Sequence, residues 1–486
     1  MKSLLSIVAA AGFVLGAAPA FAEECVGGVC SLPVPTSAGS QIVENALDAQ
    51  AAPSARDIQT SVDSYLASAK SDASLVGGCG SAGYAGGFWI RGGTFLLKIS
   101  LTIQTRWEGF QWKDEVASPQ TGGDLSGFSL PRVTLKLSGD ATCDVHYYAE
   151  LEFGHSGLWF ENSTGASSLL TDLLDAANGA GSVPAAGSTA AAAFYGVARE
   201  AWIEYEAAPL LAVRMGLIKT ATTRQLMTPP EMQQFVDVSI ASVFVGMAAP
   251  GYSDRNRDYG VMVHGALGCD GAWQYLLTVT NGDGPVHRNV LDGRTDDPMA
   301  YSARLNWDIL GHMGYEEGAL RQHSCEWTAA VGAWGHYYVD HIRENPLAHF
   351  SDRSTYGVDA AVGWGGLSLT AAYNVIDFSY TAGTTVKGWS WLAQVGYLFP
   401  GTAWELAARY DVYHFESDFI TAKYGVDEIG VAVNYYIDGH SDKITLDASF
   451  LSPTDDGNRM ADTYAGYNVT LTSDATLLRL QWQLAL

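Results

Sequence analysis

The amino-acid sequence predicts an all-β protein: a transmembrane antiparallel β-barrel of about sixteen strands with a short N-terminal periplasmic extension. Three observations support this prediction. Only 16% of the residues are charged, although 48% are hydrophobic. From Phe88 onward, hydrophobic and polar residues alternate one by one, as in strands with one lipid-facing side. Short links and long links mostly alternate between these segments, which is typical of membrane barrels.

The composition excludes several other classes of protein. The charged fraction is well below the roughly 25% of soluble domains. After Ala22, no apolar run approaches the roughly 20 residues that a spanning helix needs. The formal net charge is −25, so nucleic acid is not an expected partner. We expect the apolar face of the barrel to contact outer-membrane lipid instead.

Residues 1–22 have the features of a secretory signal peptide. Lys2 provides the basic start, an apolar run follows, and Ala20 and Ala22 are the small residues of a cleavage site. The alternative is an uncleaved anchor, but the apolar run is shorter than a spanning helix. We therefore predict export to the cell outer membrane.

Residues 23–87 differ in composition from the rest of the chain. They are rich in Ala, Ser and Gly and nearly free of aromatic residues. Two interpretations stay open, a short helix or coiled-coil stub and a disordered linker. We assign the segment to a periplasmic extension and residues 88–486 to the barrel.

Individual segments of the barrel show the alternation clearly. Between Tyr301 and Asp308, the residues Tyr, Ala, Leu and Trp alternate with Ser, Arg, Asn and Asp. The final segment, from Leu478 to Leu486, places Leu and Trp on one face and Arg and Gln on the other. Sixteen such segments, each near the roughly ten residues that a tilted strand needs to cross a bilayer, leave a water-filled lumen. One predicted turn, near 309–323, is longer than the pattern requires.

Six cysteines in an exported chain favour disulfides over a metal site. Fifteen pairings are compatible with six cysteines, and the sequence does not choose among them. The spacing of Cys25 and Cys30 lacks a second ligand pair, so we expect no metal. We also expect no cofactor.

Several segments of the predicted barrel carry distinctive motifs: Phe128–Gly139 (FSLPRVTLKLSG), His146–Phe153 (HYYAELEF), Arg199–Tyr205 (REAWIEY), Val213–Lys219 (VRMGLIK), Gln234–Asp237 (QFVD), Ser239–Ser242 (SIAS) and Arg257–Gly265 (RDYGVMVHG). Together these motifs resemble the phosphate-selective porin O/P family of outer-membrane porins. The resemblance extends more loosely from about residue 93 to Leu486. It implies a homotrimer of sixteen-stranded barrels, in which the third long loop, residues 219–256, folds inward and narrows the lumen.

The resemblance also implies which residues line the ion pathway. Lys219 and Arg224, near the start of the third loop, are the expected constriction cations. Five further cations alternate onto the predicted lumenal face: Arg132, Lys136, Arg214, Arg304 and Arg409. Two departures from the family are visible. The third loop lacks a lysine cluster, and the chain ends in Leu486 where barrel proteins usually end in an aromatic residue.

The function predicted from these features is a porin for passive diffusion of small hydrophilic solutes or ions, with inorganic phosphate and other anions as candidates. The sequence lacks the Gly-x-Ser-x-Gly, His-Glu-x-x-His and P-loop motifs, so no enzymatic activity is expected. Two alternatives stay open. One is a structural barrel that anchors the envelope. The other is a barrel with a hydrolase site at its rim, for which His155 with Glu152, or His414 with Asp411, are the candidate pairs.

Overall fold

A computed structural model gives the fold of the barrel. It describes residues 80–84, 86–113, 125–154, 198–248, 256–268, 271–282, 299–320, 326–339, 350–380, 385–417, 422–454, 460–462, 469–471 and 474–486. The predicted signal peptide and most of the predicted extension lie outside these residues.

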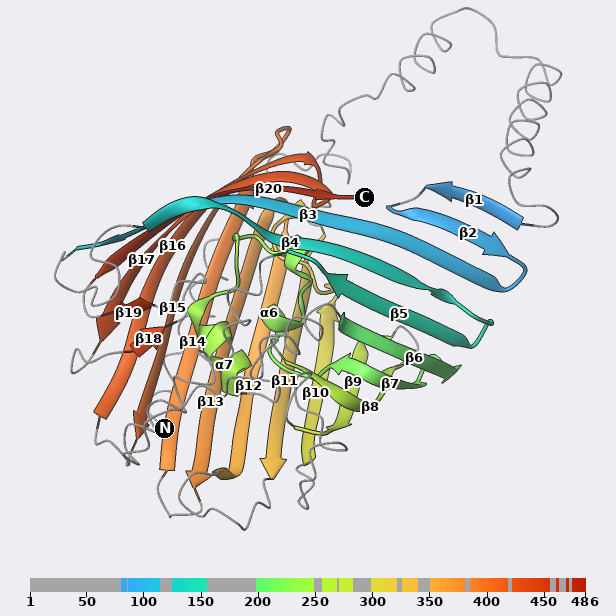
Figure 1. Ribbon diagram of the computed structural model, residues 1–486, viewed down its shortest axis with the longest axis horizontal. Helices are drawn as coiled ribbons and strands as arrows, with labels where there is room; N and C mark the ends of the chain where they lie inside the picture. Colours follow the sequence, from blue (N-terminus) through green and yellow to red (C-terminus); the bar gives the residue numbers. More distant parts are fainter. Residues whose placement is uncertain are drawn as a thin grey trace, which may run out of the picture.

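Sixteen strands form a closed ring (Figure 1). In chain order they are β3 (Phe95–Trp112), β4 (Leu125–Asp140), β5 (Val145–Glu152), β6 (Ala198–Ala208), β7 (Leu211–Lys219), β8 (Arg257–Leu267), β9 (Trp273–Thr280), β10 (Met299–Leu310), β11 (Thr328–Val339), β12 (Phe350–Trp364), β13 (Leu367–Tyr380), β14 (Thr385–Leu398), β15 (Trp404–Ser417), β16 (Ala422–Asp438), β17 (Asp442–Thr454) and β20 (Ala475–Ala485).

Each strand pairs antiparallel with its neighbour, and the last strand closes the ring on the first. β20 pairs with β3 from Ala475↔Trp112 to Ala485↔Thr102, and two main-chain hydrogen bonds join Leu486 to Leu101. The predicted fold class, an antiparallel barrel of about sixteen strands, is confirmed. The alternating pattern was sufficient to predict this fold class, because every strand has one lipid-facing side and one lumenal side.

Two short hairpins lie outside the ring. β1 (Gly80–Tyr84) pairs with β2 (Phe88–Gly92), and β2 pairs with the Phe95–Ile99 part of β3. This hairpin therefore extends the sheet beyond the C-terminal end of β20 (Figure 1). The second hairpin joins β18 (Met460–Asp462) to β19 (Val469–Leu471).

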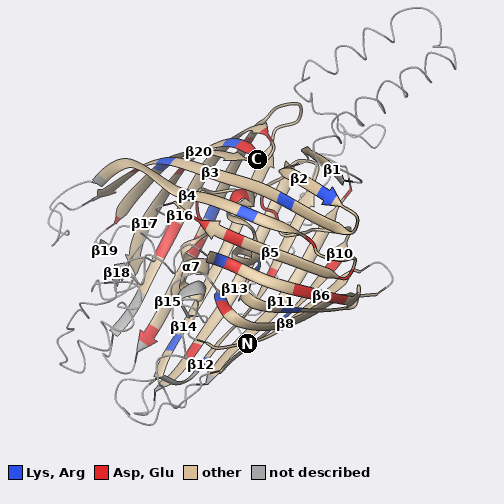
Figure 2. Cartoon of the chain, turned by 45° about the vertical axis from the view of Figure 1, so that its right-hand side comes forward, with Lys and Arg blue, Asp and Glu red and all other residues tan. Residues whose placement is uncertain are grey.

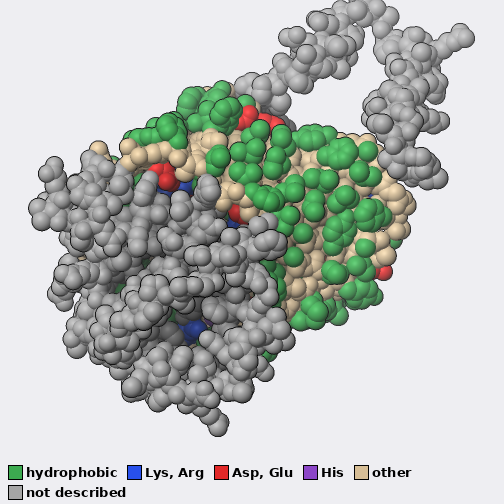
Figure 3. All heavy atoms as spheres, in the orientation of Figure 1, with side chains coloured by type: hydrophobic (Ala, Val, Ile, Leu, Met, Phe, Trp, Pro, Cys, Tyr) green, Lys and Arg blue, Asp and Glu red, His purple; other side chains and the backbone are tan. Residues whose placement is uncertain are grey.

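The two faces of the wall differ as the alternation predicts. Along β10, exposed and buried residues alternate: Tyr301, Leu305 and Trp307 face outward, while Ser302 and Arg304 face the lumen. Figure 3 shows hydrophobic side chains covering the visible outer face of the barrel. The helices in the described part of the chain are all too short to cross a membrane.

One stretch of chain runs inside the ring rather than around it. Residues 220–248 follow β7 and contain α6 (Arg224–Met227), the 3₁₀ turn η5 (Pro230–Met232) and α7 (Ile240–Ala248). We call residues 220–248 the inner loop. Figure 1 shows α6 and α7 within the barrel, and α7 contacts β12, β13, β14 and β15.

Candidate functional site

Small wall residues leave room for the inner loop on one side of the lumen. Phe235 packs on Ala407 and Ala432, from β15 and β16, and Ala241 packs on Ala372 and Leu392, from β13 and β14. Alanine side chains fill little of the lumen, so the apolar face of the loop can lie directly against the sheet. Burial of these apolar groups stabilises the loop against this wall.

A glycine on the same wall marks the closest approach of the loop. Any Cβ at Gly396 of β14 would overlap the amide nitrogen of Gln234. That side chain donates to Glu405 Oε1 at 2.8 Å and to Ser368 Oγ at 3.2 Å, and it accepts from Gln394 at 2.9 Å. The glycine is therefore needed for the Gln234 side chain to lie in this position against the sheet.

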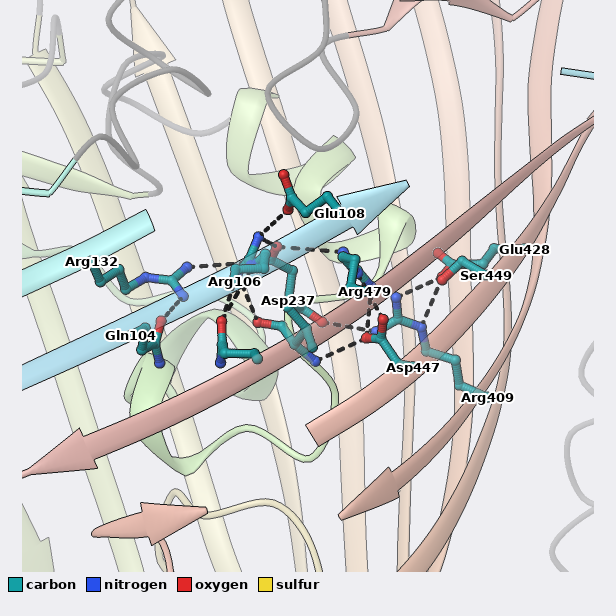
Figure 4. Close-up of polar contacts among 12 residues, drawn as sticks. Gln104, Arg106, Glu108, Arg132, Asp237, Arg409, Glu428, Asp447, Ser449 and Arg479 are labelled. Carbon is teal, nitrogen blue, oxygen red and sulfur yellow. Dashed lines mark hydrogen bonds and ion pairs between the residues drawn. The ribbon is translucent and has the colours of Figure 1, made fainter. Parts of the chain in front are cut away.

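Asp237 of the inner loop joins both sides of the seam where the barrel closes (Figure 4). Its Oδ2 lies 2.8 Å from Arg106 of β3 and 3.4 Å from Arg479 of β20, and its Oδ1 lies 3.1 Å from Arg132 of β4. The main-chain oxygen of Asp237 accepts from Arg409 at 2.9 Å. One buried carboxylate thus holds three arginines, because each guanidinium offers several donors.

The other charges near this seam are balanced by acids. Arg479 binds Asp447 with Nε–Oδ1 and Nη2–Oδ2 distances of 2.8 Å, and Arg409 binds Glu428 at 2.6 Å. Arg106 also binds Glu108 at 2.7 Å. Burying any one of these charges alone would be costly, so the acids compensate the arginines.

A second buried pair lies under the start of the inner loop. Arg304 of β10 binds Asp359 of β12 through two contacts of 2.7 Å, and both side chains are 0% exposed. Asp359 also accepts the backbone N–H of Arg224 at 2.9 Å. The guanidinium of Arg224 donates to Gly314 O and lies over the ring of Tyr315.

Two ion pairs on the opposite wall, along β4–β8, remain partly open to solvent. Lys136 pairs with Glu231 of the inner loop, and the two side chains are 17% and 16% exposed. Arg214 binds Glu204 at 2.7 Å and is 21% exposed. Figure 2 shows acidic and basic positions next to one another on this wall. Water therefore reaches these two ion pairs, whereas it is excluded from the pairs beneath the inner loop.

Three cations meet at the ends of β6, β7 and β8, where the inner loop begins. Lys219 lies opposite Arg257 across the β7–β8 strand pair. The charge of Arg199 is also close enough to repel that of Lys219. Arg257 binds Glu200 at 2.8 Å, and Arg199 lies 3.4 Å from Glu150. Among the described residues, Lys219 has no hydrogen-bond or ion-pair partner.

The seven predicted pathway cations therefore fall into three environments. Arg132, Arg304 and Arg409 are buried in ion pairs, and Arg224 is buried over the ring of Tyr315. Lys136 and Arg214 are paired but water-accessible, and Lys219 is half-buried. The sequence reasoning did not identify Arg106 and Arg479, although both alternate onto the lumenal face and could have been found by the same pattern.

The structure contradicts one of the two candidate hydrolase pairs. Asp411 is buried on the lumenal side of β15, whereas His414, three residues on, lies on the opposite face and stacks against Trp389. Their proposed pairing was wrong, because positions an odd number apart in a strand face opposite ways. His155 lies outside the described residues.

The described residues contain no group of three or more His, Cys, Asp or Glu side chains that could hold a metal. Cys143, in the turn after β4, is exposed and free. The other five cysteines lie outside the described residues.

The fold is similar to that of solved porins. An anion-selective porin from Comamonas acidovorans superposes with a TM-score of 0.53 at 13% identity, covering 81% of this chain and 100% of that chain. OprB of Pseudomonas putida gives 0.49 at 10% identity, covering 80% of this chain and 94% of that one. OmpT of Vibrio cholerae, expressed in the outer membrane, gives 0.49 at 7% identity, with coverages of 82% and 99%.

No curated protein matches the sequence significantly. A family model described as Gram-negative porin matches residues 99–450, which include thirteen complete strands of the ring, β4 to β16, and most of β3 and β17. The chain therefore belongs to the Gram-negative porin family, and its fold and family together place it in the outer membrane.

Proposed function

We propose that this protein is an outer-membrane porin through which small hydrophilic solutes and ions diffuse passively. The observation that carries the proposal is the contrast between the two lumenal walls. Ion pairs beneath the inner loop are fully buried, whereas two pairs on the β4–β8 side, Lys136–Glu231 and Arg214–Glu204, remain water-accessible. An aqueous path along β4–β8, narrowed by the inner loop, accounts for both the buried and the water-accessible ion pairs.

The charge along this path favours weak selectivity. Lys136 and Arg214 each face an acid, so their fields partly cancel, and Lys219 contributes an unpaired positive charge. Fixed charges at a narrow section set the selectivity of a pore. We therefore propose a modest preference for anions, with inorganic phosphate among the permeating solutes. The resemblance to an anion-selective porin is consistent with this preference.

The remaining assignments follow from the same proposal. Residues 1–22 act as a cleaved signal peptide, residues 23–87 extend into the periplasm, and residues 219–256 form the constriction. The short-turn end of the barrel faces the periplasm. The functional unit is a homotrimer in outer-membrane lipid, as in the trimer form of Vibrio cholerae OmpT.

The test is conductance of the purified protein in a planar bilayer under a salt gradient, followed by titration with phosphate. The proposal expects large steps with a small anionic reversal potential. Block by low phosphate would establish a phosphate site, and steps indifferent to phosphate would establish a general porin. A folded barrel that gives no steps would contradict the proposal and favour a structural role.

A further inference from the structure

The turn between β10 and β11 folds into the lumen, unlike the short turns beside it. Residues 311–320 lie at the same end of the barrel as the tight turns 365–366 and 399–403. Met313 is 4% exposed and packs on Ala330 and Ala361 of the wall. Ala319 is 0% exposed and packs on Leu398 and Tyr436. This turn is therefore a packed element, although it lacks regular secondary structure.

Glu317 of this turn binds the inner loop directly. Its Oε1 accepts from the Gln225 side chain at 2.9 Å, and its Oε2 accepts from the Gln234 backbone N–H at 3.0 Å. Gln394 of β14 also donates to Oε2, at 3.0 Å. The Glu317 backbone N–H donates to Met232 O at 2.9 Å. One 5% exposed residue thus ties two parts of the inner loop to the wall.

Further contacts fasten both ends of the turn. Near its start, Gly314 O accepts from Arg224 of the inner loop, and Tyr315 Oη accepts from Arg304 at 2.9 Å. Near its end, the Ala319 N–H donates to Glu405 of β15 at 3.0 Å. These contacts close the space between the inner loop and β10–β17 from the short-turn end.

We propose that turn 311–320 is a latch that holds the inner loop against β10–β17 and so confines solutes to the β4–β8 side of the lumen. Glu317 is its main positioning residue. The inference rests on the proposed channel function, since it specifies which part of the lumen conducts. Without the latch, the inner loop would be held from the wall side alone and would leave that wall more often.

The test uses a graded series at Glu317, measured in the full-length protein. Glu317→Ala removes the acceptor of three hydrogen bonds. At about fivefold in population for each bond, the detached state of the loop should rise about a hundredfold. We expect higher open-channel noise and a higher mean conductance, with a weaker effect in Glu317→Gln, which keeps one acceptor oxygen.

The matched control is His312→Ala. His312 lies on the same turn, but its side chain is 66% exposed and contacts Asp308 of β10, not the inner loop. In a double variant, Gln225→Ala with Glu317→Ala, the added effect of Gln225→Ala should be smaller than in the wild-type background, because the hydrogen bond between the two residues is lost only once; the loss of the Ser239 contacts of Gln225 is the same in both backgrounds. A merely destabilised barrel would instead show additive loss of heat-resistant migration in gels.

The outcomes separate the two proposals. If wild-type protein does not conduct, the channel function itself fails. If wild-type protein conducts and folded Glu317→Ala channels match His312→Ala in noise and conductance, the latch is overturned.

Discussion

Replacing Asp237 by Asn should make the channel more anion-selective. Four arginines near the seam, Arg106, Arg132, Arg409 and Arg479, face five acids, Asp237, Glu108, Asp411, Glu428 and Asp447. The substitution keeps the size of the side chain but removes one negative charge, so the lumen wall becomes more positive by one unit.

The magnitude follows from Coulomb's law. An anion passing at about 5 Å in water-like surroundings gains about 0.8 kcal/mol from one added unit charge, and about 0.4 kcal/mol at about 10 Å. These energies correspond to about fourfold and twofold increases in local anion occupancy. Breaking the buried contacts also costs the folded protein about 3–5 kcal/mol, but Val236, next to Asp237, stays bound to Asp447 at 3.0 Å.

The assay is the reversal potential of single channels under a salt gradient. Asp427→Asn is the matched control, because Asp427 lies on a barrel strand and contacts Tyr410 on its exposed side, at 3.0 Å. It loses the same charge outside the lumen. The effect should shrink as salt rises, since the screening length falls to about 3 Å at 1 M.

One result would refute the reasoning. If Asp237→Asn and Asp427→Asn give the same reversal potential at low salt while both proteins fold, the Asp237 cluster does not act on passing ions. The ion path would then lie farther from the seam than one screening length.

Four further predictions concern the inner loop and its surroundings. Lys219→Glu changes the charge by two units, so it should shift the reversal potential toward cations about twice as far as Asp237→Asn shifts it toward anions. Because Arg224 is buried over the ring of Tyr315, Arg224→Glu should mainly lower thermal stability. Deleting residues 219–256 with a short linker should enlarge single-channel conductance, and an unchanged value would exclude the loop as the constriction. Gly396→Leu should displace Gln234 and raise open-channel noise, whereas Gly401→Leu, in an open turn, should not. Acid should also raise noise, in a manner that depends on His440.

The acid effect has a definite sign. Burial holds the pKa of His440 below its ordinary value, and its Nε2 lies 3.3 Å from Glu316 and 3.2 Å from Glu317 O, while Nδ1 faces Lys443 at 3.3 Å. Glu405 and the ring of Tyr436 complete its surroundings. Because the folded state resists protonation, stability is lost as the pH falls below about 6.5. His440→Gln channels should lack this acid-dependent noise.

The barrel was predictable because its rule is local. Each strand needs only an apolar residue at every second position, and this alternation is directly visible in segments such as Tyr301–Asp308. The cluster at Asp237 was not predictable, since its arginines lie 131, 105 and 242 positions away. No local pattern specifies which lumenal cation meets which acid.

Only its length indicated that the turn between β10 and β11 differs from the other short turns. The segment near 309–323 was longer than the other short turns, and Gly311, Gly314 and Gly318, all with positive φ, indicate sharp bends. Its direction depends on Glu317 meeting Gln225, Gln234 and Gln394, which are supplied by two distant parts of the chain. The extra length therefore indicated an unusual turn, but the sequence alone does not show which residues this turn contacts.

The seam between β3 and β20 has a consequence for assembly. It joins residues as far apart as Arg106 and Gln481, 375 positions in sequence, and such distant pairings form slowly. Asp237 contacts Arg106 and Arg132 on one side of this seam and Arg479 on the other. An unclosed barrel therefore lacks one side of the binding site for its own inner loop. We therefore expect the inner loop to reach its final position only when β20 pairs with β3, so that closure of the barrel and narrowing of the lumen occur together, late in assembly.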